Sequence, residues 1–367
     1  MTMKRLLILA NSDSAIFKFR SELIEALSAD YNIGIGIPFG QYMEEIKNDK
    51  YEFFDIPINR HGLNPLEDYK LIERYKRLIK DFKPDVMLLY TIKPNLYGSI
   101  AAMKYHVPCI CNITGLGSAL EREGLLQKFL ILMYRYAMQK EHTIFFQNAH
   151  SKEFFIEHRI GKGGQYYVLP GSGVNLERFK MLPYPTDDII RFFFIARVIK
   201  EKGIDEFLYV AKRFHEEKKN AEFHICGACE EAYEEILQEA NQKGIIKYHG
   251  LVKDMREMYA MASCIVLPSY YPEGQSNVLL EGAASGRPLI TTNHPGCREA
   301  VNDGLSGFLV RKKDKEDLYA KMNSIYNMPI NVREAMGKNG RKKMEEGFDR
   351  NIVINAYKQR LSSIDGK

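Results

Sequence analysis

Residues 268–282 read Pro-Ser-Tyr-Tyr-Pro-Glu-Gly-Gln-Ser-Asn-Val-Leu-Leu-Glu-Gly. The four apolar residues before this stretch end at a proline, as a short buried strand does. Ser276 is a suitable N-cap for the apolar-periodic run from Val278 to Ala284. The stretch is therefore expected to pass from a strand through a loop into a helix. This order places Glu273 in the loop and Glu281 on the second turn of the helix.

The two carboxylates flank a set of backbone amides. The amides of Ser276, Asn277 and Val278 are expected to point out of the helix N-terminus, which is a favourable place for a phosphate. A carboxylate beside a bound anion would be repelled unless it also accepted hydrogen bonds from sugar hydroxyls. The pattern therefore favours a nucleotide-sugar, with one acid on each side of its diphosphate, over a bare nucleotide.

Short apolar runs alternate with longer amphipathic segments along the whole chain, which is typical of βα units around a parallel sheet. Strands are expected at 5–10, 33–37, 86–90, 108–112, 143–146 and 166–169, and then at 191–196, 221–226, 246–249, 264–267, 288–292 and 307–310. Helices are expected at 14–29, 66–81, 95–105, 123–139 and 150–158, and then at 204–217, 230–242, 254–261, 277–285 and 314–326. The fold class is α/β, with two consecutive doubly wound, Rossmann-like domains and ligands at the carboxyl ends of the strands.

A stretch rich in Gly, Pro and Asn, 170–186, is the expected hinge between the two domains. The N-terminal domain is predicted to span residues 1–172 and the C-terminal domain residues 173–349. A last helix, about 350–367, is expected to pack back onto the first domain.

Composition excludes several classes of protein. A chain of 367 residues suits two domains, and 45% hydrophobic with 27% charged residues describes a globular protein. The net charge of +5 is too small for a nucleic-acid-binding signature. Six cysteines do not form a disulfide framework, so a reducing compartment is expected. The first apolar run is too short for a signal peptide, and no run is long enough to span a membrane.

The segment Glu273-Gly274-x-Ser276-Asn277-x-x-x-Glu281 resembles the Glu-x7-Glu motif of retaining glycosyltransferases with the GT-B fold, in family 4. The resemblance covers nearly the whole chain and is strongest from about 168 to 310. Further matching segments are Ile195-Ala196-Arg197, Glu201-Lys202-Gly203-Ile204, residues 173–179, Gly296-Cys297-Arg298-Glu299 and Asp303-Gly304-x-x-Gly307. In the N-terminal half, residues 93–98 and 112–118 are similar to the branch that builds bacterial capsules, O-antigens and related lipid-linked glycans.

The resemblance implies two domains that face a central cleft, and it implies roles for individual residues. Glu273 would bind the donor sugar and Glu281 the ribose hydroxyls, while Arg197 and Lys202 would stabilise the departing diphosphate. Glu273, Arg197 and Lys202 form the expected catalytic set, and the expected donor-binding set is Gly227, Gly250, Leu251, Val252, Gly274, Ser276, Asn277, Val278 and Glu281. No bound metal or other cofactor is expected, because no Asp-x-Asp motif occurs where a donor site could use one and the two cations supply the charge.

Plainer interpretations stand beside these roles. Glu273 and Glu281 could be an ordinary helix-start acid and a surface acid, and Arg197 and Lys202 a solvated pair at a helix start. Residues 250–252 could form a plain turn rather than frame a nucleobase. The Cys-x-x-Cys at 226–229 could be a redox pair, but it lacks a second such pair for zinc, and the family needs only a small residue at Gly227.

The N-terminal half is expected to bind the acceptor. The acceptor candidates are Ser14, Arg60, Lys93, Thr114 and Gly115. Arg60 could hold a phosphate bidentately or stabilise a turn. Two features depart from the family: the loop 11–14 contains no glycine, and no histidine stands near residues 114–115, where many members carry one.

The segment 124–136 is apolar on more than one face. It could be a buried packing helix, or it could rest on a membrane with help from the basic helix that carries Arg74, Lys76, Arg77, Lys80 and Lys83. We expect a cytoplasmic protein in peripheral contact with the inner face of the cell membrane.

These features predict a retaining glycosyltransferase that moves a sugar from a nucleotide diphosphate, expected to be a UDP-hexose or a UDP-N-acetylhexosamine. The expected acceptor is a glycan hydroxyl on a polyprenyl-diphosphate-linked oligosaccharide. The alternatives are a nucleotide-sugar epimerase with the GT-B fold and a non-catalytic GT-B scaffold. A dinucleotide oxidoreductase is disfavoured, because no Gly-x-Gly-x-x-Gly follows the first strand.

Overall fold

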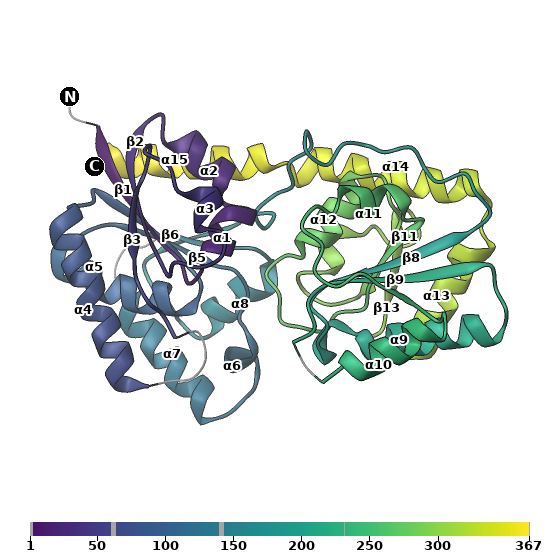
Figure 1. Ribbon diagram of the computed structural model, residues 1–367. Coiled ribbons are helices and arrows are strands. Elements are labelled where there is room, and N and C mark those ends of the chain that lie inside the picture. The colour runs from purple at the N-terminus through teal and green to yellow at the C-terminus, as the bar shows by residue number, and fades with distance from the viewer. Residues whose placement is uncertain (1–2, 60–63, 139–142, 231, 367) are drawn as a thin grey trace. The chain divides into compact units, whose positions relative to one another are not determined.

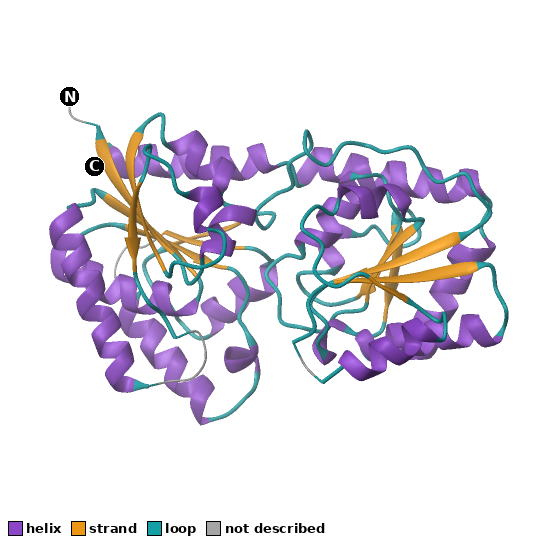
Figure 2. Cartoon of the chain, viewed as in Figure 1, coloured by secondary structure: helices purple, strands orange, loops and turns teal. Residues whose placement is uncertain are grey.

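The computed structural model describes residues 3–59, 64–138, 143–230 and 232–366. The chain divides into two compact units (Figure 1). Unit 1 comprises Met1–Ser172 and Val353–Lys367, and unit 2 comprises Gly173–Ile352. Each unit consists of a parallel sheet with helices on both faces (Figure 2), as expected when strands are linked by helical crossovers.

The sheet of unit 1 has seven strands in the order β3-β2-β1-β4-β5-β6-β7, all parallel. The strands are β1 (Lys4–Leu9), β2 (Tyr31–Ile37), β3 (Glu52–Asp55), β4 (Val86–Tyr90), β5 (Cys109–Ile113), β6 (Thr143–Phe146) and β7 (Gln165–Val168). The strand order reverses between β1 and β4, which makes their carboxyl ends the switch point of this sheet.

Two helical layers cover this sheet. One core joins it to α4 (Pro65–Phe82), the π-helix η1 (Pro94–Gly98), α5 (Ser99–Tyr105), α6 (Ser118–Glu121), α7 (Leu125–Ala137) and α8 (Ala149–Glu157). The other core joins it to α1 (Asp13–Phe19), α2 (Ser21–Leu27), α3 (Met43–Ile46) and the C-terminal helix α15 (Arg350–Asp365). The phenol of Tyr357 on α15 bonds Asn112 and lies 3.1 Å from the hydroxyl of Tyr90, which fixes this helix to β4 and β5.

The sheet of unit 2 has six parallel strands in the order β10-β9-β8-β11-β12-β13, and its order reverses between β8 and β11. The strands are β8 (Ile190–Ile195), β9 (Ala221–Cys226), β10 (Lys247–Tyr248), β11 (Cys264–Leu267), β12 (Leu289–Thr292) and β13 (Gly307–Val310). The surrounding helices are η2 (Lys200–Lys202), α9 (Ile204–Glu216), α10 (Glu234–Gln242), α11 (Arg256–Met261), α12 (Asn277–Ala284), η3 (Arg298–Ala300), α13 (Lys315–Asn327) and α14 (Ile330–Gly347).

Most expected elements are present, and the differences have physical reasons. The helix expected at 14–29 is interrupted at Arg20, and the one expected at 123–139 begins only after Gly124. Strand β3 was missed because its sequence, Glu-Phe-Phe-Asp, offers only two apolar residues at the edge of the sheet. Helix α14 was missed because its apolar positions are few and include two buried glycines, Gly337 and Gly340.

Within the described residues, no helix combines the length and the apolar character that crossing a bilayer requires.

A buried histidine on β9 gives unit 2 a pH-sensitive feature. The ring of His224, on β9, stacks on Phe193 at 4.2 Å, and its Nδ1 lies 3.0 Å from Nε2 of His249. Its Nε2 lies 3.1 Å from a carboxylate oxygen of Glu222, which also binds Lys247. Burial, opposed in part by Glu222, lowers the pKa of His224 to about 4.

We expect this histidine to make the folded protein sensitive to acid. Because the pKa is depressed in the folded state, the unfolded chain binds the extra proton between pH 6.5 and 4, so stability falls as pH falls through this window. The expected loss is on the order of 2–3 kcal/mol, measured as the unfolding free energy in urea between pH 7 and 4. His224→Phe should flatten this slope. An unchanged slope would mean that His224 is already charged in the folded protein.

Candidate active site

The loops that follow β8 and β11 meet at the switch point of unit 2. Gly203 closes the first loop with φ +81°, and a Cβ atom there would lie 2.4 Å from the carbonyl oxygen of Pro268, at the start of the second loop. The amide of Tyr270 donates to the carbonyl of Glu201 at 2.8 Å. These contacts join two loops from distant parts of the chain into one surface at the carboxyl edge of the sheet.

Lys202 and Glu273 form an ion pair across these two loops. Lys202 is only 9% exposed, and Glu273 also accepts a hydrogen bond from the Ser269 hydroxyl at 3.3 Å. Because both charged groups are largely removed from water, each depends on the other for compensation. The pair therefore fixes a cation and a carboxylate side by side at the edge where ligands of such sheets bind.

Arg197 lies next to this pair. Its guanidinium is 5.4 Å from the ring centroid of Tyr271, and the Lys202 ammonium is 5.1 Å from the same ring. A carboxylate oxygen of Glu230 lies 2.8 Å from Arg197, with both side chains about half exposed. An exposed ion pair of this kind contributes little free energy, so Arg197 can exchange Glu230 for a ligand phosphate at small cost. No motif in the sequence indicates a role for Glu230.

The start of helix α12 corrects one expectation. The amide of Ser276 is not available to a phosphate, because it donates to the carbonyl of Gly296 at 2.8 Å, and the Ser276 side chain makes no capping hydrogen bond. The first amide bonded within the helix is that of Leu280, which leaves Val278 and Leu279 at helical positions without an intrahelical acceptor. Of the three amides expected to face a phosphate, that of Ser276 is thus engaged within the protein itself.

Gly296 shapes the loop that carries Glu273. It has φ +88°, and a Cβ atom there would lie 2.7 Å from the carbonyl of Glu273 and 2.9 Å from that of Gly274. Its own amide donates to Glu299 at 2.8 Å. The 296–299 segment therefore packs against the backbone of the loop that carries Glu273.

Glu281 is oriented by a tyrosine that the sequence did not reveal. The hydroxyl of Tyr259, on α11, donates to a carboxylate oxygen of Glu281 at 2.9 Å. Tyr259 is fully buried, and burial together with the Glu281 charge raises its pKa well above the usual value. The phenol therefore keeps its proton and holds the carboxylate in one direction.

The loops after β9 and β10 are joined at two glycines. The amide of Gly227 donates to the carbonyl of Gly250 at 2.7 Å, and the Tyr248 hydroxyl donates to the carbonyl of Gly227 at 3.1 Å. Leu251 follows with its side chain 58% exposed, and Val252 is half-buried.

Burial raises the pKa of the Cys226 thiol to about 12, which argues against a reactive Cys-x-x-Cys.

All the donor-site candidates thus follow the carboxyl ends of four adjacent strands of one sheet. Arg197 and Lys202 follow β8, Gly227 follows β9, residues 250–252 follow β10, and residues 273–281 follow β11.

The acceptor candidates of unit 1 follow the carboxyl ends of β1, β4 and β5. The hydroxyl oxygen of Ser14 lies 3.1 Å from that of Ser12. Thr114 and Gly115 are half-buried in the loop after β5. Lys93 forms a largely buried ion pair with Asp68 at 2.8 Å, so a phosphate would have to compete with that carboxylate. Arg60 lies outside the described residues.

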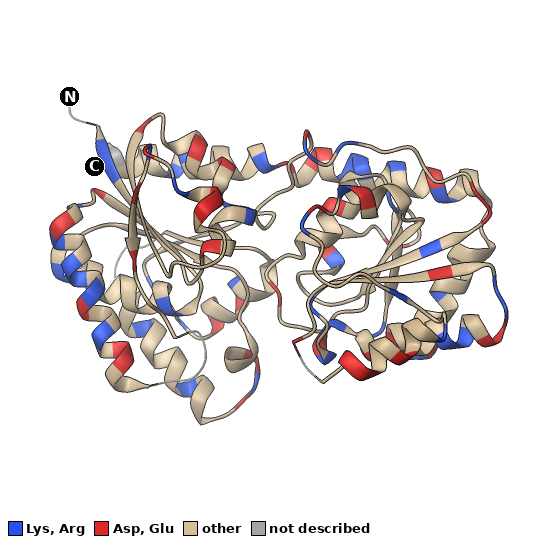
Figure 3. Ribbon diagram, in the orientation of Figure 1, with Lys and Arg blue, Asp and Glu red and all other residues tan. Residues whose placement is uncertain are grey.

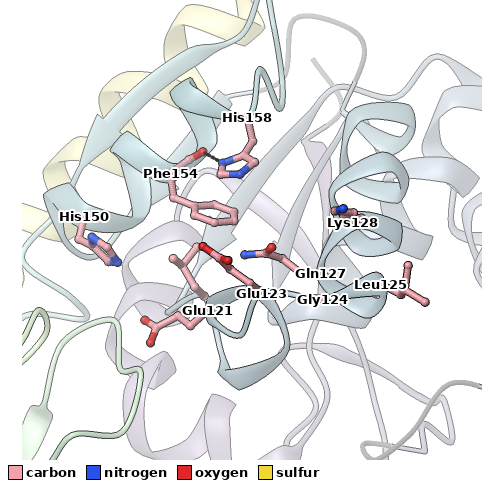
Figure 4. Close-up of a pocket in the computed structure, with 10 residues that line it drawn as sticks. Glu121, Glu123, Gly124, Leu125, Gln127, Lys128, His150, Phe154 and His158 are labelled. Atoms are coloured by element: carbon pink, nitrogen blue, oxygen red, sulfur yellow. Dashed lines mark hydrogen bonds between the residues drawn. The ribbon is translucent and has the colours of Figure 1, made fainter.

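A pocket of about 720 Å³ opens in unit 1, beside α7 and α8. Sequence reasoning did not find it. Its lining comprises Leu116, Glu121, Glu123, Gly124, Leu125, Gln127, Lys128, His150, Phe154 and His158 (Figure 4).

Two doubly wound parallel units, the second with paired cations and acids at its switch point, are the architecture of a GT-B glycosyltransferase. Residues 177–343 match the family described as glycosyl transferases group 1, and residues 5–148 match the family described as glycosyl transferase 4-like. The chain is a glycosyltransferase with a group 1 domain and a 4-like domain, and it has the GT-B fold.

Several curated relatives are similar over most of their length. The N,N'-diacetylbacillosaminyl-diphospho-undecaprenol alpha-1,3-N-acetylgalactosaminyltransferase of Campylobacter jejuni is 24% identical, over 96% of this chain and 97% of the relative. The capsular polysaccharide biosynthesis glycosyltransferase CapM of Staphylococcus aureus is 26% identical, over 84% and 85%. A UDP-Gal:alpha-D-GlcNAc-diphosphoundecaprenol alpha-1,3-galactosyltransferase of Escherichia coli is 25% identical, over 86% and 83%.

Solved structures agree on the fold. Sucrose-phosphate synthase from Thermosynechococcus elongatus superposes with a TM-score of 0.80 at 15% identity, over 99% of both chains. Anabaena HepE, solved in complex with UDP and glucose, gives a TM-score of 0.79 at 15% identity, over 98% of this chain and 100% of HepE. The protein is thus a glycosyltransferase, and the matching families are those of transferases rather than epimerases.

Proposed function

We propose that this glycosyltransferase moves a hexose or N-acetylhexosamine from a UDP-sugar to a glycan hydroxyl, with retention of anomeric configuration. The observation that carries the proposal is the buried Lys202–Glu273 pair beside Arg197 at the switch point of unit 2. Two cations with one carboxylate suit a ligand that joins a diphosphate to a sugar. Three of the relatives described above carry names that place them in capsule or undecaprenyl-diphosphate glycan synthesis.

The proposed reaction breaks the bond between the anomeric carbon and the β-phosphate oxygen and forms a bond from that carbon to the acceptor oxygen. The acceptor proton passes to the departing phosphate, so no protein nucleophile is needed. Lys202 and Arg197 stabilise the charge that develops on the diphosphate, and these two cations make a divalent metal unnecessary in this proposal. Glu273 accepts hydrogen bonds from the donor-sugar hydroxyls and Glu281 from the ribose.

The proposed acceptor is an oligosaccharide on a polyprenyl diphosphate, met at the inner face of the cell membrane by a cytoplasmic protein in peripheral contact. Basic residues on α4, whose positions are blue on the ribbon in Figure 3, support this placement. They are Lys70, Arg74, Lys76, Arg77 and Lys80. Cations near an anionic leaflet attract the protein to the lipid surface.

The test is a transfer assay with purified protein, a panel of UDP-, GDP- and dTDP-sugars, and a polyprenyl-diphosphate-linked acceptor. We expect product only with a UDP-sugar, and an NMR coupling constant of the new linkage that matches the configuration of the donor. Conversion of the donor alone, without acceptor, would instead indicate an epimerase. Calorimetric titration with UDP should show binding, and absence of heat with all three nucleotides would contradict the donor assignment.

A further inference from the structure

The pocket in unit 1 is formed at the carboxyl edge of its sheet. The segment from Leu116 to Lys128 follows β5, and α8 follows the adjacent strand β6. Its polar lining includes carboxylates, an amide and imidazoles, which accept hydrogen bonds from hydroxyls or donate hydrogen bonds to them. The side chains involved are Glu121, Glu123, Gln127, His150 and His158.

The pocket also offers a flat apolar surface. The ring of Phe154 stacks on that of His158 at 4.1 Å, and His158 Nδ1 lies 2.9 Å from the Phe154 carbonyl, so the two rings are held together. Figure 4 shows these rings on one side of the pocket and the side chains of Glu123 and Gln127 on the other. A pocket with one apolar surface and several hydrogen-bonding groups suits a sugar ring.

Helix α7, which begins at the pocket, is apolar on two opposite faces. One face packs into the core of unit 1 through Leu130, Ile131, Tyr134 and Ala137. The other carries an exposed stripe at helical spacing, which we call the α7 stripe: Leu125, Phe129, Leu132 and Tyr136, exposed by 86%, 49%, 60% and 54%. Such a face on an otherwise packed helix marks a binding surface for an apolar partner.

Two cations lie beside the pocket and the α7 stripe, which adjoin at Leu125. Lys128 lines the pocket and is exposed. Arg135 is seven residues further along the helix, on the same side, and its Nε donates to the carbonyl of His158 at 2.7 Å. The polar pocket, the two cations and the α7 stripe therefore adjoin on this part of unit 1.

We infer that this surface binds the acceptor as one amphiphile: its sugar in the pocket, its diphosphate beside Lys128 and Arg135, and its polyprenyl chain in the bilayer along the α7 stripe. The inference rests on the proposed function and names the site of its acceptor. A polyprenyl-diphosphate glycan joins a sugar, an anionic diphosphate and an apolar chain, and the pocket, the two cations and the α7 stripe offer one adjoining surface for each part. The carboxylates of Glu121 and Glu123 favour the neutral sugar over the diphosphate inside the pocket.

The stripe is tested by vesicle co-sedimentation of the double variant Phe129→Glu/Leu132→Glu. The matched control is Ile236→Glu/Leu305→Glu, which changes side chains exposed by 49% and 53% in unit 2. With vesicles containing phosphatidylglycerol and a polyprenyl diphosphate, the stripe variant should bind about 10-fold more weakly than wild type, and the control should bind as wild type does. Equal sedimentation of wild type and the stripe variant would overturn the inference.

The pocket is tested by kinetics with two acceptors, one on a polyprenyl diphosphate and one carrying the same glycan on a short water-soluble alkyl diphosphate. The variant Glu123→Ala/His150→Ala should raise KM about 10-fold for both acceptors and leave KM for the UDP-sugar unchanged. The stripe variant should lose turnover only with the polyprenyl acceptor. Unchanged acceptor KM in the pocket variant would refute the pocket assignment.

Failure of the proposed function has a different signature. If the wild type transferred sugar to neither acceptor, the proposed reaction would be wrong, while the vesicle experiment would still decide whether the α7 stripe binds a polyprenyl diphosphate surface.

Discussion

Lys202→Ala should lower kcat by about 10²–10³-fold, because it removes a fixed charge from the leaving diphosphate. The ammonium is held by Glu273 and lies beside the ring of Tyr271, so it needs no reorganisation as the sugar–phosphate bond breaks. Its effect should be larger on kcat than on the affinity for UDP, because the charge on the β-phosphate grows in the transition state. The measurement is steady-state transfer with saturating donor and acceptor.

The matched control is Lys200→Ala, in the same short helix η2 but with an exposed side chain. Its kcat should stay within about twofold of wild type, because charges at the surface are screened. Thermal unfolding is measured as well, because Lys202→Ala leaves the largely buried Glu273 without its cation and should also lower Tm. Lys202→Arg should restore Tm more than turnover. A kcat of Lys202→Ala close to wild type would show that the phosphate assignment is wrong.

The pairing of Lys202 with Glu273 illustrates what the sequence could predict. The two residues are 71 positions apart, yet each follows a short apolar run. Phe192, Phe193 and Phe194 are fully buried in β8, as expected for a strand with helices on both faces. Once two such runs are assigned to one doubly wound sheet, their following loops must lie at the same edge. The placement of these residues at one sheet edge was predictable because strand ends, unlike side-chain contacts, follow from the pattern of apolar residues.

Side-chain partners could not be predicted in the same way. Tyr259 donates a hydrogen bond to Glu281, and Glu230 forms an ion pair with Arg197. In both cases the partner lies on a separate element, and the sequence does not specify how these elements pack. The Ser276 amide donates to the carbonyl of Gly296, and no residue pattern indicates this loop contact. These three contacts decide the orientation of the acid, the freedom of the arginine and the number of amides left for a phosphate.

Helix α7 shows a second limit of the sequence. Its apolar residues fall on two faces, and a periodic pattern cannot distinguish a helix buried on both from one buried on a single face. The structure shows that Tyr134 is buried while Leu125 and Leu132 are exposed. The pocket beside this helix could not be predicted from the sequence either, because it depends on how α8 packs against the start of α7.

Gly227→Ala should lower the affinity for UDP by about 100-fold or more, equivalent to roughly 2.7 kcal/mol. A Cβ atom at this position, where φ is +155°, would lie 1.7 Å from the carbonyl oxygen of Ala196 and 2.6 Å from its carbonyl carbon. Both are backbone atoms, so the clash can be relieved only by moving a loop. Ala196 directly precedes Arg197, and the Gly227 amide donates to the carbonyl of Gly250 at 2.7 Å, so the loops proposed to bind the phosphates and the base would move together.

Gly244→Ala separates this effect from backbone strain. Gly244 has φ +70° in unit 2, and a Cβ atom there would meet no other atom within 4 Å, so this variant bears only the cost of a left-handed alanine, about 1 kcal/mol. Both variants should lower Tm, but only Gly227→Ala should weaken UDP binding in a calorimetric titration. If the two variants bound UDP equally well, the loops after β8, β9 and β10 would not act together on the nucleotide. If the Arg197 loop holds the diphosphate, displacing this loop must weaken UDP binding. Unchanged binding would therefore mean that the close approach of Gly227 to Ala196 serves only the packing of the sheet edge.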